Sequence, residues 1–592
     1  MMLYSRSVRK PLLKSLRSTA NTSLSPAPNL THYLQRHQHI VTMVQFINAS
    51  PTPFHAVHNA SERLESAGFQ RIYEKDNWEK QLKEGGRYFF TRSGNTLVDY
   101  LGRQIEHPIQ KSIFLDSVHN SQGLEGRRGP LYRRSPGVQT FQSRLLAVET
   151  YGGGIWHSWF DRWLNPSYYL KGSKTESLHR DLSLAGRVIV TDKNSTKFTS
   201  RLVNLKRPLL RIPTLAIHLD RTVNDNFKFN QETQFIPILG QVASQLNGPP
   251  VPETSDKNPV IGVAGSNVQT NHHASLIDLI AEDISVSPEE IHDFELCLYD
   301  VQPSQAGGIN NEFIFSPRLD NLMSSFCAVE AMADSVSSDR AVPLEGNVNV
   351  IALFNHEEIG SVSTSGAESS LLPTLFHRLS PTPAAHAQSI SRSFLVSADM
   401  GHAIHPSYMD SHEQVHRPEI NGGLVVKTNA KQRYATDAVG TFLIRKLVEN
   451  RGGRIQEFEV RNDMPCGSTV GPMLSKLGLR TVDVGMPMLS MHSIRETGGT
   501  KDVQYVILPQ LYAARSDHPL GHISMHSPRC SKRTAIIVIG INYVRARSCN
   551  SRPRGYCNRN QSPNATNNAP PNITSTISRP DSPPTEDASK PA

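Results

Sequence analysis

Residues 348–361 read VNVIALFNHEEIGS, an apolar run of strand length that passes directly into two adjacent glutamates. A short run of this kind, bounded by turn residues, predicts a strand with both faces buried. The stretches at 393–400 (SFLVSADM) and 480–489 (RTVDVGMPML) repeat the pattern, and helical patterns separate the three runs. Strands alternating with helices predict an α/β fold with a layered, mixed sheet from Phe313 onward.

The first half of the chain has a different pattern. Residues 46–69 (FINASPTPFHAVHNASERLESAGF) have the spacing of an amphipathic helix closed by Gly68, and RYFFTRSGNTLV at 87–98 predicts two strands joined by a turn. Residues 181–252 hold several strand-like runs, of which RLVNLKRPLLRIPTLAIHL at 201–219 is the longest. This part of the chain therefore predicts a β-rich region.

The charge of the chain is concentrated at its two ends. Of the net charge of +9 over 592 residues, residues 1–50 contribute +6 and residues 529–592 contribute +7, which leaves −4 for residues 51–528. A mildly acidic folded part does not predict a nucleic-acid partner. No stretch approaches the roughly 18 consecutive apolar residues of a membrane span, so no membrane partner is expected either.

The N-terminus and the cysteines bear on the compartment. Residues 1–25 are rich in Lys, Arg and Ser and lack acids, as in mitochondrial transit peptides, although an unstructured basic extension or a misassigned start is the simpler interpretation. The six cysteines form no CxxC pair, so neither a zinc ribbon nor a redox pair is predicted. A reducing compartment is the simpler interpretation of these cysteines.

Acidic and histidine residues follow the predicted strands or begin a helix. They are Asp320 in SPRLDNL, Glu357 and Glu358 in NHEEIGS, Asp399 in SADMGH, and His492 in SMHSIRE. Ligands of open α/β sheets bind at the carboxyl ends of the strands, and carboxylates together with imidazoles are ligands of zinc. A two-metal hydrolase also needs a free carboxylate to take a proton from water, which an adjacent Glu-Glu pair can supply.

Taken singly, each of these residues has a simpler interpretation. A Glu-Glu pair is usually a solvated helix start, Asp320 could be a helix N-cap, and His492 could be a core or surface histidine. The ordered set is what favours a metal site.

The chain resembles the aspartyl aminopeptidase family of zinc metallopeptidases over roughly residues 43–96, 149–162 and 181–506. Eight motifs in order carry this resemblance: ETYGGGIWHSWFDR, RIPTLAIHLDR, SPRLDNL, NHEEIGS, SADMGHAIHPSYMD, INGGLVVKTNAKQRYATD, NDMPCGSTVGP and VGMPMLSMHSIRE.

The resemblance implies a role for each residue of the set. Asp320 would bridge two zinc ions, Glu358 and His492 would complete one metal, and Asp399 would hold the other. Glu357 would be the general base for the attacking water.

The resemblance also implies a substrate site. His402 and Tyr434 would bind substrate or stabilise the tetrahedral intermediate, and Lys427 would offer a positive charge to an acidic N-terminal side chain. His218 would reach the active site of a neighbouring subunit, although by itself a histidine in an apolar strand is more often a core residue. A lone Lys427 would likewise be read as a surface lysine.

The architecture implied is a zinc-peptidase domain interrupted by a smaller β-rich dimerisation domain, in a dimer-based homo-oligomer that can be a dodecamer. Its substrates would be peptides with N-terminal Asp or Glu, and its compartment the cytoplasm or the vacuole. The expected boundaries are a basic extension at 1–42, a catalytic domain at 43–97 and 300–507, an aberrant segment at 98–148, the dimerisation domain at 149–299 with an insertion at 163–180, and an aberrant basic tail at 508–592.

One family motif is absent. A His-Thr-Asp-Ser-Pro sequence, whose His would hold the second metal with Asp399, is missing between residues 92 and 149, where only His107 and His119 occur and neither has the required context. One zinc site should therefore be weakened. The aberrant segments resemble translated intron or wrongly joined exon sequence.

Two alternatives to an acid-specific aminopeptidase stay open. The missing motif favours a catalytically silent assembly subunit or binding protein, whereas the intact Glu357, Glu358, Asp399 and His492 do not. A neutral aminopeptidase or carboxypeptidase on a similar sheet would share the metal ligands but not Lys427 and the residues around it.

Overall fold

The structure is a computed structural model. It describes residues 28–503 except for 84, 103–110, 118–123, 126–142, 146–148, 151–153, 161–179, 192–196, 217, 222–226, 232, 242–267, 273, 337–347 and 450–451. His107, His119 and the segments 163–179 and 508–592 lie outside the described residues.

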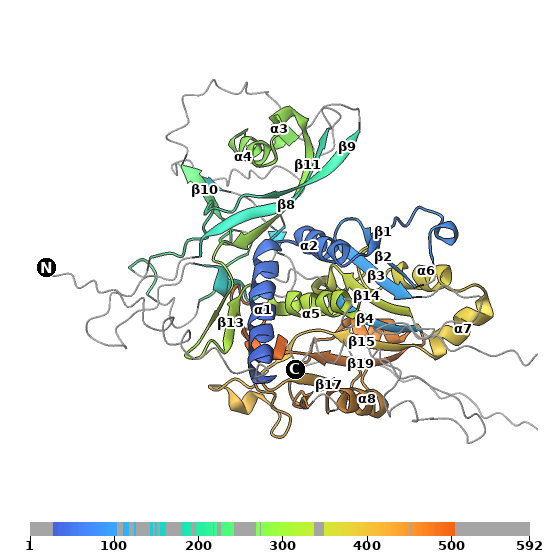
Figure 1. Ribbon diagram of the computed structural model, residues 1–592. Helices are drawn as coiled ribbons and strands as arrows, with labels where there is room; N and C mark the ends of the chain where they lie inside the picture. Colours follow the sequence, from blue (N-terminus) through green and yellow to red (C-terminus); the bar gives the residue numbers. More distant parts are fainter. Residues whose placement is uncertain are drawn as a thin grey trace, which may run out of the picture. The chain divides into compact units, whose positions relative to one another are not determined.

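A nine-stranded mixed sheet forms the frame of the molecule's α/β part (Figure 1). Its four central strands, β14, β4, β15 and β19, run parallel to one another, so their carboxyl ends share one edge. The sheet order is β1 (Gln70–Arg71), β2 (Gly86–Arg92), β3 (Thr96–Gly102), β14 (Val348–Phe354), β4 (Lys111–Ser117), β15 (Phe394–Ala398), β19 (Arg480–Gly485), β17 (Leu424–Thr428) and β18 (Ile455–Glu459).

Helices cover both faces of this sheet, which confirms the layered α/β fold expected from the sequence. Every residue of β14 is buried, with Ile351 and Leu353 packing into the core on one face and Val350 and Phe354 into the core on the other. The first core includes helices α1 (Pro28–Ala49), α2 (Pro53–Ser66), α5 (Leu319–Ser335) and α8 (Ala438–Glu449). The second includes α6 (Leu371–Arg378) and α9 (Val470–Ser475), with α7 (Pro383–Ser391) beside α6.

Two strands of the β-rich region predicted at 181–252, β8 (Leu182–Thr191) and β9 (Phe198–Asn204), belong to a separate five-stranded antiparallel sheet with its own core, whose other strands come from outside that region. The order of this sheet is β7 (Glu149–Thr150), β5 (Leu124–Glu125), β11 (Ile291–Asp300), β8 and β9. Helices α3 (Val268–Asn271) and α4 (Ala274–Ile284) and a short ladder of β6 (Ser143–Leu145) with β10 (Ile238–Gln241) accompany it. Another five-stranded sheet has the order β12 (Gln305–Gly307), β13 (Phe313–Ser316), β21 (Glu496–Gly499), β20 (Pro487–Leu489) and β16 (Gly401–His402).

Two local predictions need correction. The single helix expected at 46–69 is two helices, because Pro53 starts a new helix whose N-cap Thr52 accepts a hydrogen bond from the His55 N–H. The long run at 201–219 forms a strand only to Asn204, since Pro208 lacks a backbone donor for a ladder and Lys206 has a positive φ of 38°.

Within the part of the chain that the structure describes, no helix combines the length and the apolar character needed to cross a membrane.

Candidate metal centre

The carboxyl ends of β14 and β15 carry three of the expected site residues. Glu357 and Glu358 lie in a short 3-10 helix, η6 (Glu357–Ile359), that begins three residues after β14 ends. Asp399 directly follows β15, and its N–H donates to the carbonyl of Val484 on the neighbouring strand β19. Because these strands are parallel, the three carboxylates are delivered to the same edge of the sheet.

Asp320 enters the site from the first turn of α5. Its backbone is not helical (φ −75°, ψ 109°), and its carboxylate oxygen Oδ2 lies 3.3 Å from His492 Nε2. The side chain therefore faces the histidine, and the alternative of a helix N-cap is not supported.

Asp320, Glu358 and His492 form a group whose ligand atoms lie within 4.8 Å of one another. Glu358 Oε1 is 2.9 Å from His492 Nε2. Burial alone would lower the pKa of His492, but hydrogen bonds and negative charge from Asp320 and Glu358 raise it to about 12. Carboxylate oxygens and imidazole nitrogens are both zinc ligands, and catalytic zinc sites have three protein ligands.

The local charge also fits a cation. Burial, reinforced by the charges of Asp399, Glu358 and Asp320, raises the pKa of Glu357 well above its ordinary range. Burial and the neighbouring Asp399 likewise raise the pKa of Asp320 to about 7, and its Oδ1 is buried without a hydrogen-bond partner among the described residues. Crowded, desolvated carboxylates are stabilised by a bound metal ion, so the residues present fit divalent zinc.

Lys427 lies beside an expected metal ligand. It is buried, and its Nζ lies 2.9 Å from Asp399 Oδ2 and donates to the carbonyl of Met400 at 2.6 Å. Burial alone would raise the pKa of Asp399, but the Lys427 charge and hydrogen bond hold it below its usual value. Lys427 is therefore a charge partner of an expected metal ligand, and the interpretation as a surface lysine is wrong.

Gly485 makes this ion pair possible. A Cβ atom at this position would lie 2.0 Å from the Asp399 carbonyl oxygen and 2.9 Å from Lys427 Cε. A glycine is needed here because the backbone after β15 and the Lys427 side chain both approach the end of β19.

Two of the remaining substrate residues lie near Lys427, and the third is exposed in a turn. The Tyr434 ring lies 5.5 Å from Lys427 Nζ, and its hydroxyl accepts a hydrogen bond from Cys466 Sγ at 3.4 Å. Burial and the positive charge of Lys427 lower the pKa of His402, in β16, to about 4, although the charge of Asp399 opposes this shift. His218 is exposed in a turn instead of buried in a strand, and no interaction among the described residues joins it to the metal centre.

Sequence reasoning did not single out Glu496, although it lies four residues after His492 in the same motif. Its burial, at 1% exposure, marks it as a carboxylate with a specific environment. An acidic residue so close to a candidate ligand was the available signal. The segment after β4, where the chain would have to supply a further histidine, lies outside the described residues.

Comparison with known proteins agrees with this geometry. The family model described as "Aminopeptidase I zinc metalloprotease (M18)" matches residues 46–167 and 167–513. The chain is 44% identical to the aspartyl aminopeptidase of Aspergillus oryzae, over 79% of this chain and 94% of that protein. It is 40% identical to aspartyl aminopeptidase 4 of Saccharomyces cerevisiae, over 78% of this chain and 92% of that protein.

Solved structures give the same result. The cryo-EM structure of the Ape4 and Nbr1 complex matches with a TM-score of 0.71 and 39% identity, covering 81% of this chain and 85% of that chain. The crystal structure of prApe1 matches with a TM-score of 0.66 and 26% identity, covering 81% and 95%. The chain therefore belongs to the aminopeptidase I zinc metalloprotease family, M18, and is a metal-dependent aminopeptidase.

Proposed function

We propose that this aminopeptidase removes N-terminal Asp and Glu from peptides. The observation that carries the proposal is the convergence of Asp320, Glu358 and His492 into one group of candidate ligands. Glu357 is close enough to this group for its charges to raise the Glu357 pKa, and Lys427 contacts Asp399. The relatives named aspartyl aminopeptidase support the acidic substrate class.

Each residue has a task in this proposal. Asp320, Glu358 and His492 hold zinc, which when bound polarises the scissile carbonyl and lowers the pKa of water. Glu357 takes the proton of the attacking water at its carboxylate and passes it to the departing amine. Its crowded surroundings raise its pKa, which suits a group that must hold a proton between the two steps. Tyr434 and His402 orient the substrate.

The number of metal ions follows from the same residues. We infer two zinc ions per subunit, and Asp320 and Asp399 are the residues that would hold the second, as the family resemblance implies. The first ion has three candidate protein ligands, whereas Asp399 is not part of any larger ligand group among the described residues and is already paired with Lys427. The second site should therefore bind zinc more weakly than the first.

Selectivity for an acidic residue rests on Lys427. Its ammonium is a buried positive charge next to the cluster, and an ammonium attracts the carboxylate of an N-terminal Asp or Glu. Asp399 would be shared between Lys427 and a bound zinc ion, so part of the ammonium's charge would be available to the substrate carboxylate.

We also propose a dimer-based homo-oligomer, in which the exposed His218 reaches the active site of a neighbouring subunit. A 26% identical solved structure, that of the S. cerevesiae mApe1 dodecamer, supports a large assembly of this kind. Light scattering after gel filtration should give a multiple of the 65.7 kDa chain mass, and a monomer would contradict this part of the proposal. The compartment stays a prediction: cytoplasm or vacuole, with mitochondria if residues 1–25 act as a transit peptide.

A substrate panel tests the proposed selectivity. Aspartyl- and glutamyl-p-nitroanilide should be cleaved at least about tenfold faster than leucyl-p-nitroanilide, as kcat/KM, because an opposite charge in a desolvated pocket is worth at least about 1.4 kcal/mol. Lys427→Met should remove that preference. Lys431→Met, an exposed lysine four residues away, is the matched control and should not.

The alternatives give other outcomes. Faster cleavage of the leucyl substrate would indicate a neutral aminopeptidase, and the absence of turnover on every substrate would indicate the silent assembly subunit. The comparisons give that second alternative no support.

A further inference from the structure

Glu496 is a buried carboxylate that contacts the backbone of two candidate zinc ligands, Asp320 and His492. It opens strand β21 and pairs there with Ser316 of β13, four residues before Asp320. Its side chain is not among the expected metal ligands, and it is only 1% exposed. Burying an acid so completely is costly unless its oxygens receive hydrogen bonds.

The two oxygens of Glu496 bind different segments of the site. Oε2 accepts hydrogen bonds from the N–H groups of Leu319 at 2.7 Å and Asp320 at 3.2 Å. Oε1 accepts one from the N–H of His492 at 2.8 Å. One planar carboxylate therefore links the backbone of the Asp320 segment to the backbone of the His492 loop, which lies more than 170 residues away along the chain.

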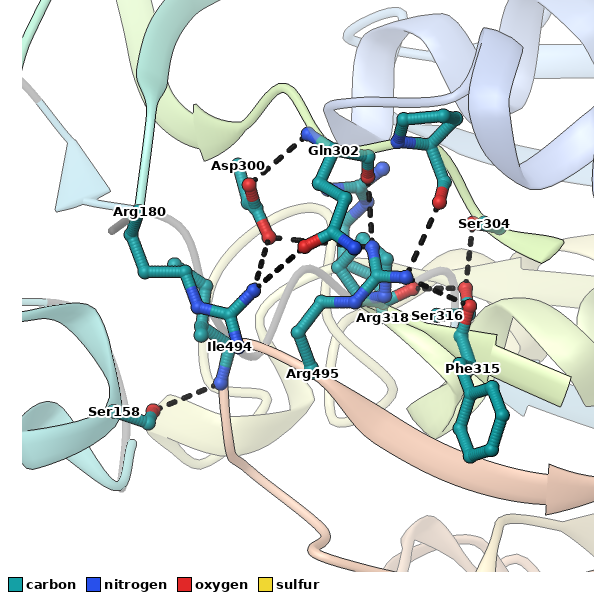
Figure 2. A network of polar contacts seen from close by, with 12 residues as sticks. Ser158, Arg180, Asp300, Gln302, Ser304, Phe315, Ser316, Arg318, Ile494 and Arg495 are labelled. Carbon is teal, nitrogen blue, oxygen red and sulfur yellow. Dashed lines mark hydrogen bonds and ion pairs between the residues drawn. The ribbon is translucent and has the colours of Figure 1, made fainter. Parts of the chain in front are cut away.

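The residues next to Glu496 are fixed in turn. Arg495 donates to three backbone carbonyls, those of Gln302 (2.7 Å), Pro303 (3.1 Å) and Phe315 (3.0 Å), and Figure 2 shows the contacts with Gln302 and Phe315. Ile494 donates its N–H to Ser158 Oγ at 2.9 Å.

The His492 loop is also held from the region of the ETYGGGIW motif. The N–H of Ile155, in that motif, donates to the His492 carbonyl at 2.9 Å. The backbone on the N-terminal side of Glu496 is thus held by several hydrogen bonds. The carboxylate of Glu496 can therefore hold the His492 loop in a fixed position.

A buried positive charge lies near the Glu496 carboxylate. Arg318, two residues before Asp320, is buried, and its charge interacts favourably with those of Asp300 and Glu496. Figure 2 places Arg318 in the network that also holds Asp300 and Arg180, whose side chains are 3.4 Å apart. An opposite charge near a buried acid reduces the cost of burying it.

We propose that Glu496 is a positioning residue that sets the spacing between the Asp320 carboxylate and the His492 imidazole, and through that spacing the zinc affinity of the site. The inference rests on the proposed function, because it takes Asp320 and His492 as zinc ligands. Residues that orient metal ligands commonly change metal affinity by roughly 10–100-fold when they are altered.

Glu496→Gln is the test variant, because it keeps the size of the side chain and replaces one acceptor oxygen by an amide that cannot accept from an N–H. Zinc affinity is measured on the full chain by competition with a chelating dye, and stability by thermal unfolding of the zinc-free protein. We expect zinc affinity to fall at least about tenfold. Excess zinc should restore much of the turnover, because Glu496 touches no substrate.

Asp502→Asn is the matched control. Asp502 is also fully buried and accepts hydrogen bonds from two backbone N–H groups, those of Asn421 (2.7 Å) and Gly423 (3.0 Å), but it contacts no expected zinc ligand. Both variants should lose thermal stability, and only Glu496→Gln should lose zinc affinity.

The outcomes separate this inference from the function on which it rests. Unchanged zinc affinity in Glu496→Gln, or an equal loss in Asp502→Asn, would overturn the positioning role and leave the aminopeptidase intact. A wild-type protein that binds no zinc would overturn the proposed metal site, and the positioning role with it.

Discussion

Glu357 and Glu358 are neighbours in the chain but lie in different surroundings. Glu358 contacts His492 directly, at 2.9 Å, and belongs to the ligand group, whereas the pKa of Glu357 responds to burial and to the three carboxylates around it. Residue spacing could place both at the end of a strand, but only the family resemblance divided the tasks between them, because that division depends on how η6 turns each side chain.

Exchange of each glutamate for glutamine should separate the two tasks. Glu357→Gln should lower kcat by about 10²–10⁴-fold and leave zinc content unchanged, because it removes only the group that moves the proton. Glu358→Gln should lower zinc content as well, because it removes a ligand. Metal content and turnover are measured on the same preparations, and loss of zinc from Glu357→Gln would contradict this division.

Lys427 and Glu496 show what the sequence does not reveal at the residue scale. The contact of Lys427 with Asp399 depends on the order of the strands, because β17 and β15 both pair with β19. The contacts of Glu496 are to backbone N–H groups, including that of Leu319 in a segment far away along the chain. Neither interaction has a signature in residue spacing. The candidate ligands Asp320, Glu358 and His492 could be proposed from the sequence because each follows a predicted strand or begins a predicted helix.

At the scale of the elements, apolar runs were the most informative signal. VNVIALF became β14, buried on both faces, because both cores of the layered fold meet on it. Strand β4 was not predictable, since residues 98–148 have no sustained period, yet it occupies the sheet between β14 and β15. The strand predicted at 201–219 was too long because hydrophobicity alone does not register the effect of Pro208 on strand pairing.

The end of β19 should tolerate no side chain. Gly485→Ala should destabilise the fold by about 3 kcal/mol or more, because the new Cβ meets a backbone oxygen that cannot move aside. It should also displace Asp399 and lower turnover. Gly240→Ala is the control, since nothing lies within 4 Å of a Cβ there. Thermal or denaturant unfolding measures both, and equal stability of the two variants would contradict the close approach at Gly485.

At the scale of the whole molecule, the net charge of the folded part and the carboxylates at one sheet edge have a common consequence. The residues between the basic ends carry −4, and the metal centre brings four carboxylates together against His492 and Lys427. Such a cluster repels itself in the absence of metal, so metal binding and stability of the fold should be linked.

Removal of metal should therefore lower the melting temperature. Dialysis against a chelator should lower Tm by several degrees, and zinc should restore it in two stages, one for a tight site and one for a weaker site. A bound ligand at about 100 times its Kd stabilises by about 2.7 kcal/mol, which is well within the range of a calorimeter. A Tm unaffected by zinc would contradict this linkage, and two equally tight sites would contradict the weakened second site.

The most direct single measurement is hydrolysis of aspartyl-p-nitroanilide by the full chain as zinc is titrated in, beside the Glu357→Gln variant under the same conditions. We expect turnover that rises with zinc, disappears with a chelator and is lost in the variant even though the variant keeps its zinc. A folded, zinc-loaded wild-type chain without turnover, or a variant as active as the wild type, would contradict the metal-dependent aminopeptidase described above.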